Sequence, residues 1–212
     1  MFDRTDELLI IADGDLPSLV ALAAARVAAK GWPSQGVDGL PPAAPAAVGI
    51  AATHPDQIRA ITEQARVFAM LTVDLAPPVF AADWLAETSL LLAACAAAAA
   101  AGRPTVVWPV QYESGDQISL DRVSKAVDRS IAATRLVQID SGVHACPDLR
   151  IDTPLVDYTD RQIADLAVDL SVPVHLCWWW DSRSGGGDAH RLRQRWMTAL
   201  AAAGFRTPDR AL

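Results

Sequence analysis

Two carboxylates and a serine follow the first strongly apolar run of the chain. Asp13, Gly14, Asp15 and Ser18 come directly after residues 8–12, which are all apolar. A pair of carboxylates can hold Mg²⁺ through its oxygen atoms, but the same residue types also form ordinary loops and helix N-caps. We favour the loop and N-cap interpretation over a metal or polar-ligand site, and we expect Gly14 to supply an unusual φ angle.

The least ordinary local feature is a run of three tryptophans at residues 178–180. Neither a strand nor a helix can point three consecutive side chains into one core, so at least one indole is expected at the surface or at an interface. Such an indole could stack on a purine or contact a protein partner. We favour core packing with one indole at the edge.

Other residue types that bind metals or act as nucleophiles match no recurrent site. The metal-binding types near the C-terminus are His175, Cys177, Asp188 and His190. Their spacing is not that of a known zinc motif. Ser141 with His144 lacks a nucleophile elbow, so hydrolase chemistry is not expected. The three cysteines contain no C-x-x-C pair and are expected to be small buried side chains.

The composition indicates one domain over residues 1–212. Hydrophobic residues make up 51% and charged residues 20% of the chain, which supports a sizeable core and excludes disorder as the main state. The longest uncharged apolar run, residues 88–102, is shorter than the roughly 20 residues that cross a bilayer. The first residues lack the pattern of a signal peptide. We therefore expect a cytoplasmic protein with no membrane interaction.

The charge is acidic overall and unevenly distributed. A formal net charge of −7 argues against general nucleic-acid binding, which needs a dense Lys/Arg surface. Residues 1–182 carry 12 basic and 23 acidic side chains, whereas residues 183–212 carry 6 and 2. Arg191, Arg193 and Arg195 belong to this basic end. A solvated face is the default expectation for them, and contact with an acidic partner, such as another subunit, is the alternative.

Short apolar runs alternate with longer helical stretches, which is typical of βα units. Strands are predicted at residues 8–12, 48–52, 105–108 and 136–139. Helices are predicted at residues 17–30, 55–70, 84–101, 119–134 and 160–170, the last of these opened by a capping box of Thr159 and Gln162. A final helix begins after Asp188 and ends before Gly204. This alternation predicts an α/β fold, a doubly wound parallel sheet with helices on both faces and a ligand crevice near Asp13.

Three stretches resemble the PP-loop ATP pyrophosphatases, and most closely the 7-cyano-7-deazaguanine synthases of the queuosine pathway. The strongest is C-terminal: a Thr-Pro-Leu segment at residues 153–155, a Val-Pro turn at residues 172–173, and residues 184–193 where the family has a zinc-binding region. Residues 12–18 resemble the family's phosphate loop, and residues 86–92 resemble its Ala-Arg-Asn-Thr helix start. The resemblance implies an adenine nucleotide alpha hydrolase-like (HUP) fold, with residues 171–212 replacing the zinc-binding region.

The residues that carry the family's chemistry are replaced in this chain. Asp13 and Asp15 place carboxylates where a triphosphate would lie, and Pro17 removes a backbone donor. Glu87 and Thr88 stand where the family has Arg and Asn, and Asp160 stands where it has Lys. The four zinc-ligand positions align with Trp180, Ser184, Gly187 and His190, so no zinc site is expected.

Two functions therefore compete. The favoured hypothesis is a catalytically degenerate PP-loop protein that needs no cofactor and acts by binding, as a partner subunit, a homo-oligomer or a small-molecule binder. The alternative is an active ATP-dependent ligase that converts a deazapurine carboxylate to a nitrile, in which Asp13 and Asp15 hold Mg²⁺. A structural component of a larger assembly is a third, more distant possibility. The candidate ligand-binding residues are Asp13, Gly14, Asp15, Ser18, Glu87, Thr88 and Asp160.

Overall fold

Five parallel strands form the centre of the molecule. The computed structural model describes residues 8–31, 46–52, 54–75, 85–112, 118–141, 146–181 and 187–206. The strands are β1 (Leu8–Ala12), β2 (Ala47–Ile50), β3 (Leu71–Asp74), β4 (Thr105–Val107) and β5 (Arg150–Asp152). Their order across the sheet is β3-β2-β1-β4-β5, and every neighbouring pair is parallel. The prediction of a parallel α/β sheet is confirmed.

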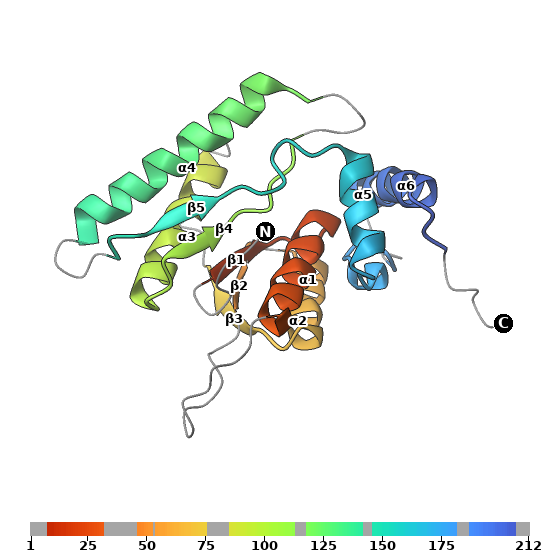
Figure 1. Cartoon of the computed structure of the whole chain (residues 1–212), viewed down its shortest axis with the longest axis horizontal. Helices are drawn as coiled ribbons and strands as arrows, with labels where there is room; N and C mark the ends of the chain where they lie inside the picture. The colour runs from red at the N-terminus through yellow and green to blue at the C-terminus, as the bar shows by residue number, and fades with distance from the viewer. Residues whose placement is uncertain are drawn as a thin grey trace.

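Helices alternate with the strands and lie on both sides of the sheet (Figure 1). One side carries α1 (Leu16–Gly31) and α2 (Pro55–Val67), and the other carries α3 (Ala86–Ala100) and α4 (Leu120–Ser141). The chain then forms α5 (Asp160–Asp169), a short 3-10 helix η3 (Val174–Leu176) and α6 (Gly187–Ala202).

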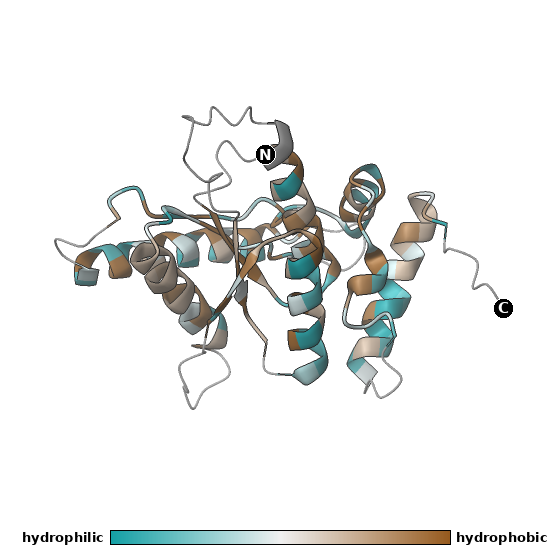
Figure 2. Cartoon of the chain, turned by 90° about the horizontal axis from the view of Figure 1, so that it is seen from below, coloured by the Kyte–Doolittle hydropathy of each residue, from teal (hydrophilic) through white to brown (hydrophobic). Residues whose placement is uncertain are grey.

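β1 is buried along its whole length, because each of its faces meets a helix layer. Leu9 and Ile11 pack into a cluster with side chains of α3 and α4. Leu8, Ile10 and Ala12 point the other way and pack with side chains of α1 and α2. A strand buried on both faces reads as a continuous apolar run, which is why the sequence identified it. Figure 2 shows these strands as brown ribbons between helices with teal outer stretches.

The C-terminal helices form a third layer against α1. Leu16 and Leu19 of α1 share one buried cluster with Ile163 of α5 and with Trp179 and Trp196. Trp179 is 1% exposed and Trp196 is 0% exposed, so the two indoles are central to this cluster. Trp178 and Trp180 are partly buried at its margin. The structure thus buries one indole of residues 178–180 and leaves two at the margin, where core packing with one edge indole was predicted.

The predicted strand at residues 136–139 is wrong, because these residues lie in α4. Val137 packs against the core, whereas Leu136 and Ile139 are 49% and 61% exposed. The run is therefore amphipathic with helical spacing. Its length and apolar character alone could not distinguish a strand from a helix segment.

Two strands, β3 and β5, were absent from the sequence prediction. Both are edge strands of the sheet, and no residue of either is fully buried. Leu71 of β3 is 58% exposed, and β5 reads Arg-Ile-Asp. Such strands bury little side-chain surface, and at four and three residues they are too short for the alternation in Leu-Thr-Val-Asp of β3 to stand out. In the part of the chain that the structure describes, no helix is long and apolar enough to cross a bilayer.

Candidate functional site

The loop after β1 lies where the strand order of the sheet reverses. β1 has β2 on one side and β4 on the other, so the chain leaves β1 in one direction and returns at β4 in the other. Ligands of open α/β sheets bind at the carboxyl ends of the strands at such a switch point. Asp13, Gly14, Asp15 and Ser18 lie together there, as predicted.

Asp13 organises the loop through one oxygen of its carboxylate. Its Oδ1 accepts the Asp15 backbone N–H at 2.9 Å and the Ser18 hydroxyl at 3.0 Å. Gly14 adopts a φ of +82°, and a Cβ atom there would lie 3.3 Å from the Gln57 carbonyl oxygen of α2. The predicted unusual φ of Gly14 is confirmed, and the close approach of α2 adds a second reason for glycine.

Asp15 is turned inward and caps the start of α1. Its Oδ1 accepts the Leu16 N–H at 2.7 Å and the Trp179 indole N–H at 2.5 Å. Burial, with the charge of Asp13 as a smaller cause, raises the pKa of Asp15 to about 6, against the hydrogen bonds from the Leu16 N–H and the Trp179 indole. Asp15 is therefore mostly ionised at pH 7, held by donors from both ends of the chain.

These contacts fill the position that an anion would take at the start of α1. Helix N-termini bind phosphate because backbone N–H groups point at the ligand. Here the N–H groups of Asp15 and Leu16 and the hydroxyl of Ser18 already donate to protein carboxylates. Pro17 has no N–H to offer.

Gln64, which sequence reasoning did not select, and the backbone of Trp178 donate hydrogen bonds to the inner side of the loop. The Gly14 carbonyl oxygen accepts the Gln64 side-chain amide at 3.2 Å and the Trp178 backbone N–H at 3.1 Å. The same Gln64 nitrogen donates to the Leu176 carbonyl at 3.0 Å. Gln64 is 0% exposed, and a glutamine on the inner side of the predicted helix at residues 55–70 was the signal available in the sequence.

Glu87 and Thr88 occupy the first turn of α3. The exposed Glu87 carboxylate pairs with Arg129 of α4 and accepts the Tyr112 hydroxyl at 3.2 Å. Burial and the Glu87 charge are the two largest causes that raise the pKa of Tyr112 to about 12. Thr88 is partly buried beside Glu87 in the same turn. The Glu87 carboxylate thus has an arginine partner from another helix.

Asp160 begins α5, behind the predicted capping box of Thr159 and Gln162, which is confirmed. Its side chain is 9% exposed, and Arg195 of α6 donates two hydrogen bonds to its carboxylate, from Nε at 2.9 Å and from a terminal nitrogen at 2.5 Å. Gln111 donates to the same carboxylate at 2.8 Å. Asp160 therefore ties α5 to α6 and to the segment after β4.

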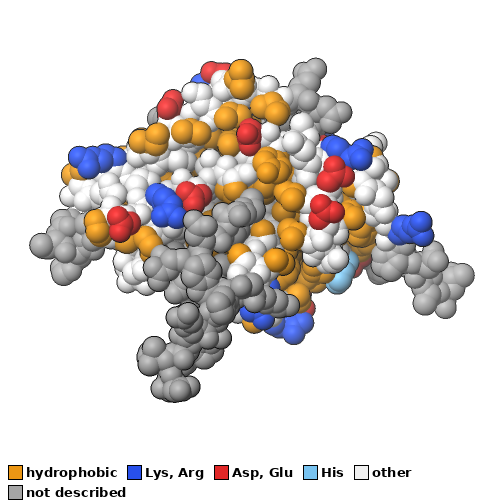
Figure 3. Space-filling view, in the orientation of Figure 1, with side chains coloured by type: hydrophobic (Ala, Val, Ile, Leu, Met, Phe, Trp, Pro, Cys, Tyr) orange, Lys and Arg blue, Asp and Glu red, His pale blue; other side chains and the backbone are white. Residues whose placement is uncertain are grey.

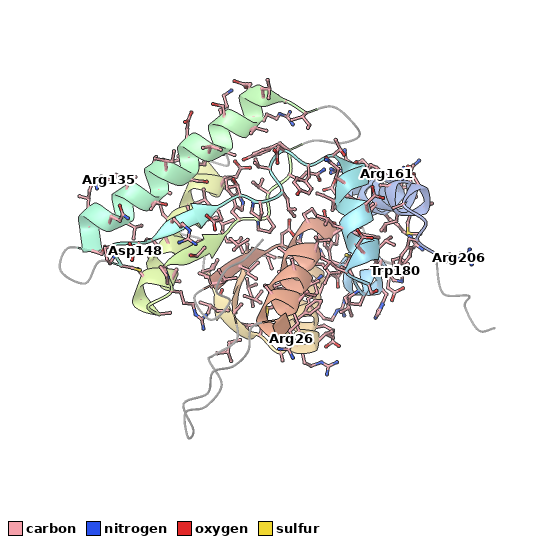
Figure 4. All side chains as sticks on the ribbon, viewed as in Figure 1. Arg26, Arg135, Asp148, Arg161, Trp180 and Arg206 are labelled. Atoms are coloured by element: carbon pink, nitrogen blue, oxygen red, sulfur yellow. The ribbon has the colours of Figure 1, made fainter. Side chains whose placement is uncertain are left out.

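The three arginines of α6 have three different environments, whereas a solvated face was the default expectation for all of them. Arg195 turns inward onto Asp160, and its guanidinium lies 4.5 Å from the Trp196 ring. Arg193 lies 6.0 Å from the Trp180 ring, at the α5–α6 end of the molecule where Figure 4 labels that tryptophan. Only Arg191, paired with Asp188 and 78% exposed, fits a solvated face fully.

The candidate residues form three hydrogen-bonded groups, not one. Asp13, Gly14, Asp15 and Ser18 make the first group, Glu87 and its partners the second, and Asp160 and its partners the third. The segment after β4 connects the last two, because Tyr112 contacts Glu87 and its neighbour Gln111 contacts Asp160.

The three groups offer few side chains that could bind a metal ion. Among the described residues, no group of three or more His, Cys, Asp or Glu side chains could hold a metal ion. Of the four positions aligned with zinc ligands, Trp180, Gly187 and His190 are described, and Ser184 lies outside the described residues. Cys177 is 3% exposed, and burial together with the charges of Asp15 and Asp13 raises the pKa of its thiol well above the usual value.

Comparison with known proteins adds no family. No protein-family model matches the chain, and no curated protein matches it. The structure supports a parallel five-stranded α/β sheet compatible with a Rossmann-like or HUP fold, without a family assignment.

Proposed function

We propose that this chain is a catalytically degenerate protein of the PP-loop type, similar to 7-cyano-7-deazaguanine synthase, that acts by binding and does not adenylate a substrate. The observation that carries the proposal is the start of α1, where Asp13 and Asp15 accept the hydrogen bonds that a phosphate would need.

Charge supports the same conclusion. An ATP phosphate brought to this loop would meet the carboxylates of Asp13 and Asp15, and like charges in a partly dry site repel by several kcal/mol. The arginines of the other two candidate groups offer little compensation, because Arg129 and Arg195 are engaged with Glu87 and Asp160. Stabilising a leaving pyrophosphate requires cationic or N–H groups that are free to receive it.

Packing gives a second line of support. Trp179 donates to Asp15 across 164 residues of sequence, and Trp196 lies in the same buried cluster. The C-terminal layer therefore packs against α1 and contacts the loop through Trp179. A protein of this design keeps the nucleotide-binding type of sheet as a scaffold, and its binding partner is a protein or a small molecule that needs no triphosphate site.

Pyrophosphate release and thermal stability test the proposal together. With ATP and Mg²⁺ at millimolar concentration, we expect no pyrophosphate in proportion to protein and no rise in melting temperature. A ligand at 100 times its dissociation constant would stabilise the native state by about 2.7 kcal/mol, which the melting curve would show. The same two measurements are made on Asp15→Ala, and Asp169→Ala, at an exposed residue, is its matched control.

The ligase hypothesis makes the opposite prediction. If Asp13 and Asp15 hold Mg²⁺ for catalysis, pyrophosphate release scales with protein, disappears in Asp15→Ala and survives in Asp169→Ala. That pattern would overturn the binding proposal.

A further inference from the structure

The outer side of α4 exposes large apolar side chains. Leu120, Ile131, Leu136 and Ile139 are between 49% and 80% exposed. α4 lies at the periphery of the molecule in Figure 1, and Figure 3 shows apolar side chains among acidic and basic ones over this part of the surface. Single exposed apolar residues are ordinary on a protein surface. Only their arrangement on the helix can indicate an interaction surface.

One line of exposed residues runs along α4 with helical spacing. Ser124, Asp128, Ile131, Arg135 and Ile139 follow one another at intervals of four, three, four and four residues, and all are exposed. Residues at these intervals share one face of a helix. The inner face of α4, with Ala126, Ser130 and Ala133, is the one buried against the core.

Two opposite charges in this line have no ionic or hydrogen-bonding partner among the described residues. Asp128 and Arg135 are exposed and unpaired there, and Figure 4 shows Arg135 pointing away from the molecule. Two other cations of the same helix are paired: Lys125 lies 2.7 Å from Asp121, and Arg129 pairs with Glu87. Asp140, which lies off this line, is exposed and likewise has no such partner in the described part of the chain. At seven residues apart, Asp128 and Arg135 are about 10 Å apart along the axis, too far to satisfy each other directly.

A second copy of α4, packed antiparallel, can pair both of these charges. Asp128 and Arg135 lie seven residues apart on one face of the helix, with their midpoint between Ile131 and Ala132. A twofold axis through that point, with two copies of α4 antiparallel, places Arg135 of each copy against Asp128 of the partner subunit. Both charges are then paired, twice, by one isologous contact.

Two of the exposed apolar residues, Ile131 and Ile139, fit the same arrangement. Ile131 faces Ala132 of the partner subunit, and Ile139 faces Ser124 of the partner subunit. At these two levels a large side chain meets a small one, which lets two helices approach closely and interdigitate. We infer that this chain forms a homodimer through antiparallel packing of α4 about this axis.

The size of the contact sets the expected strength. α4 has 22 residues, so it is about 33 Å long, and an interface along one helix lies at the small end of the range for specific complexes. The dimer is therefore concentration-dependent and is best followed by sedimentation velocity over a dilution series.

Charge reversal tests the register as well as the contact. In Arg135→Asp and in Asp128→Arg, like charges face each other twice, and we expect the dimer dissociation constant to rise by about tenfold or more. The double variant D128R/R135D restores opposite charges and restores the wild-type constant. Arg206→Asp, on an exposed residue outside α4, is the matched control and leaves the constant unchanged. Circular dichroism confirms that each variant is folded.

A second variant tests the apolar centre. Ile131→Glu removes the central contact and is expected to leave a folded monomer. A wild-type chain that stays monomeric throughout the dilution series, single reversals with no effect, or a double variant that fails to recover would each overturn the inference. None of these outcomes depends on ATP binding, so they are distinct from a failure of the proposed function.

Discussion

The loop after β1 and the outer face of α4 differ in how their polar groups are satisfied. At the loop, the carboxylates of Asp13 and Asp15 receive N–H and O–H groups from α1 and from Trp179. On α4, Asp128 and Arg135 are exposed and have no partner among the described residues. The N–H and O–H groups at the start of α1 are thus taken up by the protein's own carboxylates, whereas the charges of Asp128 and Arg135 on the peripheral helix are left to solvent. We therefore look for binding by this chain on its surface and not at the start of α1.

The largest effect is expected from opening the closed region. Trp196 is 0% exposed in the cluster that joins α1, α5 and α6, and Trp196→Ala should lower the free energy of unfolding by about 3 to 5 kcal/mol. Urea denaturation measures this change. On α4, Ile131→Glu in a monomeric sample should change it by less than about 0.5 kcal/mol. Equal losses at the two sites would break the comparison.

The two arginine–carboxylate pairs of the carboxyl edge give the next contrast. Asp160→Ala leaves Arg195 without its nearly buried partner and should destabilise the protein by about 3 kcal/mol. Glu87→Ala removes a pair whose members are 46% and 28% exposed, and should cost less than about 1 kcal/mol. Both variants are compared by chemical denaturation in the same buffer. A Glu87→Ala loss as large as that of Asp160→Ala would mean that the pair on α3 is as structural as the pair on α5.

Acid should stabilise the loop. The pKa of Asp15 is raised from 3.8 to about 6 in the folded chain, so the folded state binds its proton more tightly than the unfolded state. The stability from this group is fully present below pH 3.8 and is lost as the pH rises through about 6. The shift corresponds to at most about 3 kcal/mol.

Comparison with Asp15→Asn isolates that contribution. Unfolding free energies of the two proteins are measured between pH 4 and pH 7, and their difference should change with pH in the direction just given. Asp169→Asn, on an exposed residue, provides the control and should track the wild type. A parallel pair of curves for wild type and Asp15→Asn would show that Asp15 titrates normally.

The smallest effect concerns cysteine reactivity and leaves stability unchanged. Cys95 and Cys177 are buried, whereas Cys146 is partly exposed. Burial raises the pKa of Cys95 to about 11 and that of Cys177 still more clearly above the usual range, so neither thiol forms a reactive thiolate at pH 8. A colorimetric thiol titration of the native protein should detect Cys146 alone, and denaturant should release the other two. Rapid reaction of Cys177 would show that the C-terminal layer opens readily.

Much of the sheet could be predicted from the sequence, because β1 is a continuous apolar run and β4 is fully buried. The edge strands β3 and β5 could not, since partly exposed strands carry polar residues. The loop itself was predicted from the run Asp13-Gly14-Asp15 between a strand and a helix. Its partners were not, because Trp179 and Gln64 reach it across 164 and 50 residues of sequence.

The roles of Asp160 and Arg195 show the same limit. Sequence patterns identify which residues begin a helix, as the capping box at Thr159 did, but not which side chain of another helix will meet them. Asp160 was selected as a ligand-binding candidate, and the structure places it against Arg195 and Gln111. Long-range pairing of this kind is decided by packing, which a local pattern does not contain.

Direct titration of ATP with Mg²⁺ into the purified protein tests the central claim, that the start of α1 is closed to phosphate. Isothermal calorimetry should show no saturable binding at or below millimolar concentration, because losing two or three charge-assisted phosphate contacts removes several decades of affinity. Saturable binding with a micromolar dissociation constant, lost in Asp15→Ala and kept in Asp169→Ala, would contradict the account.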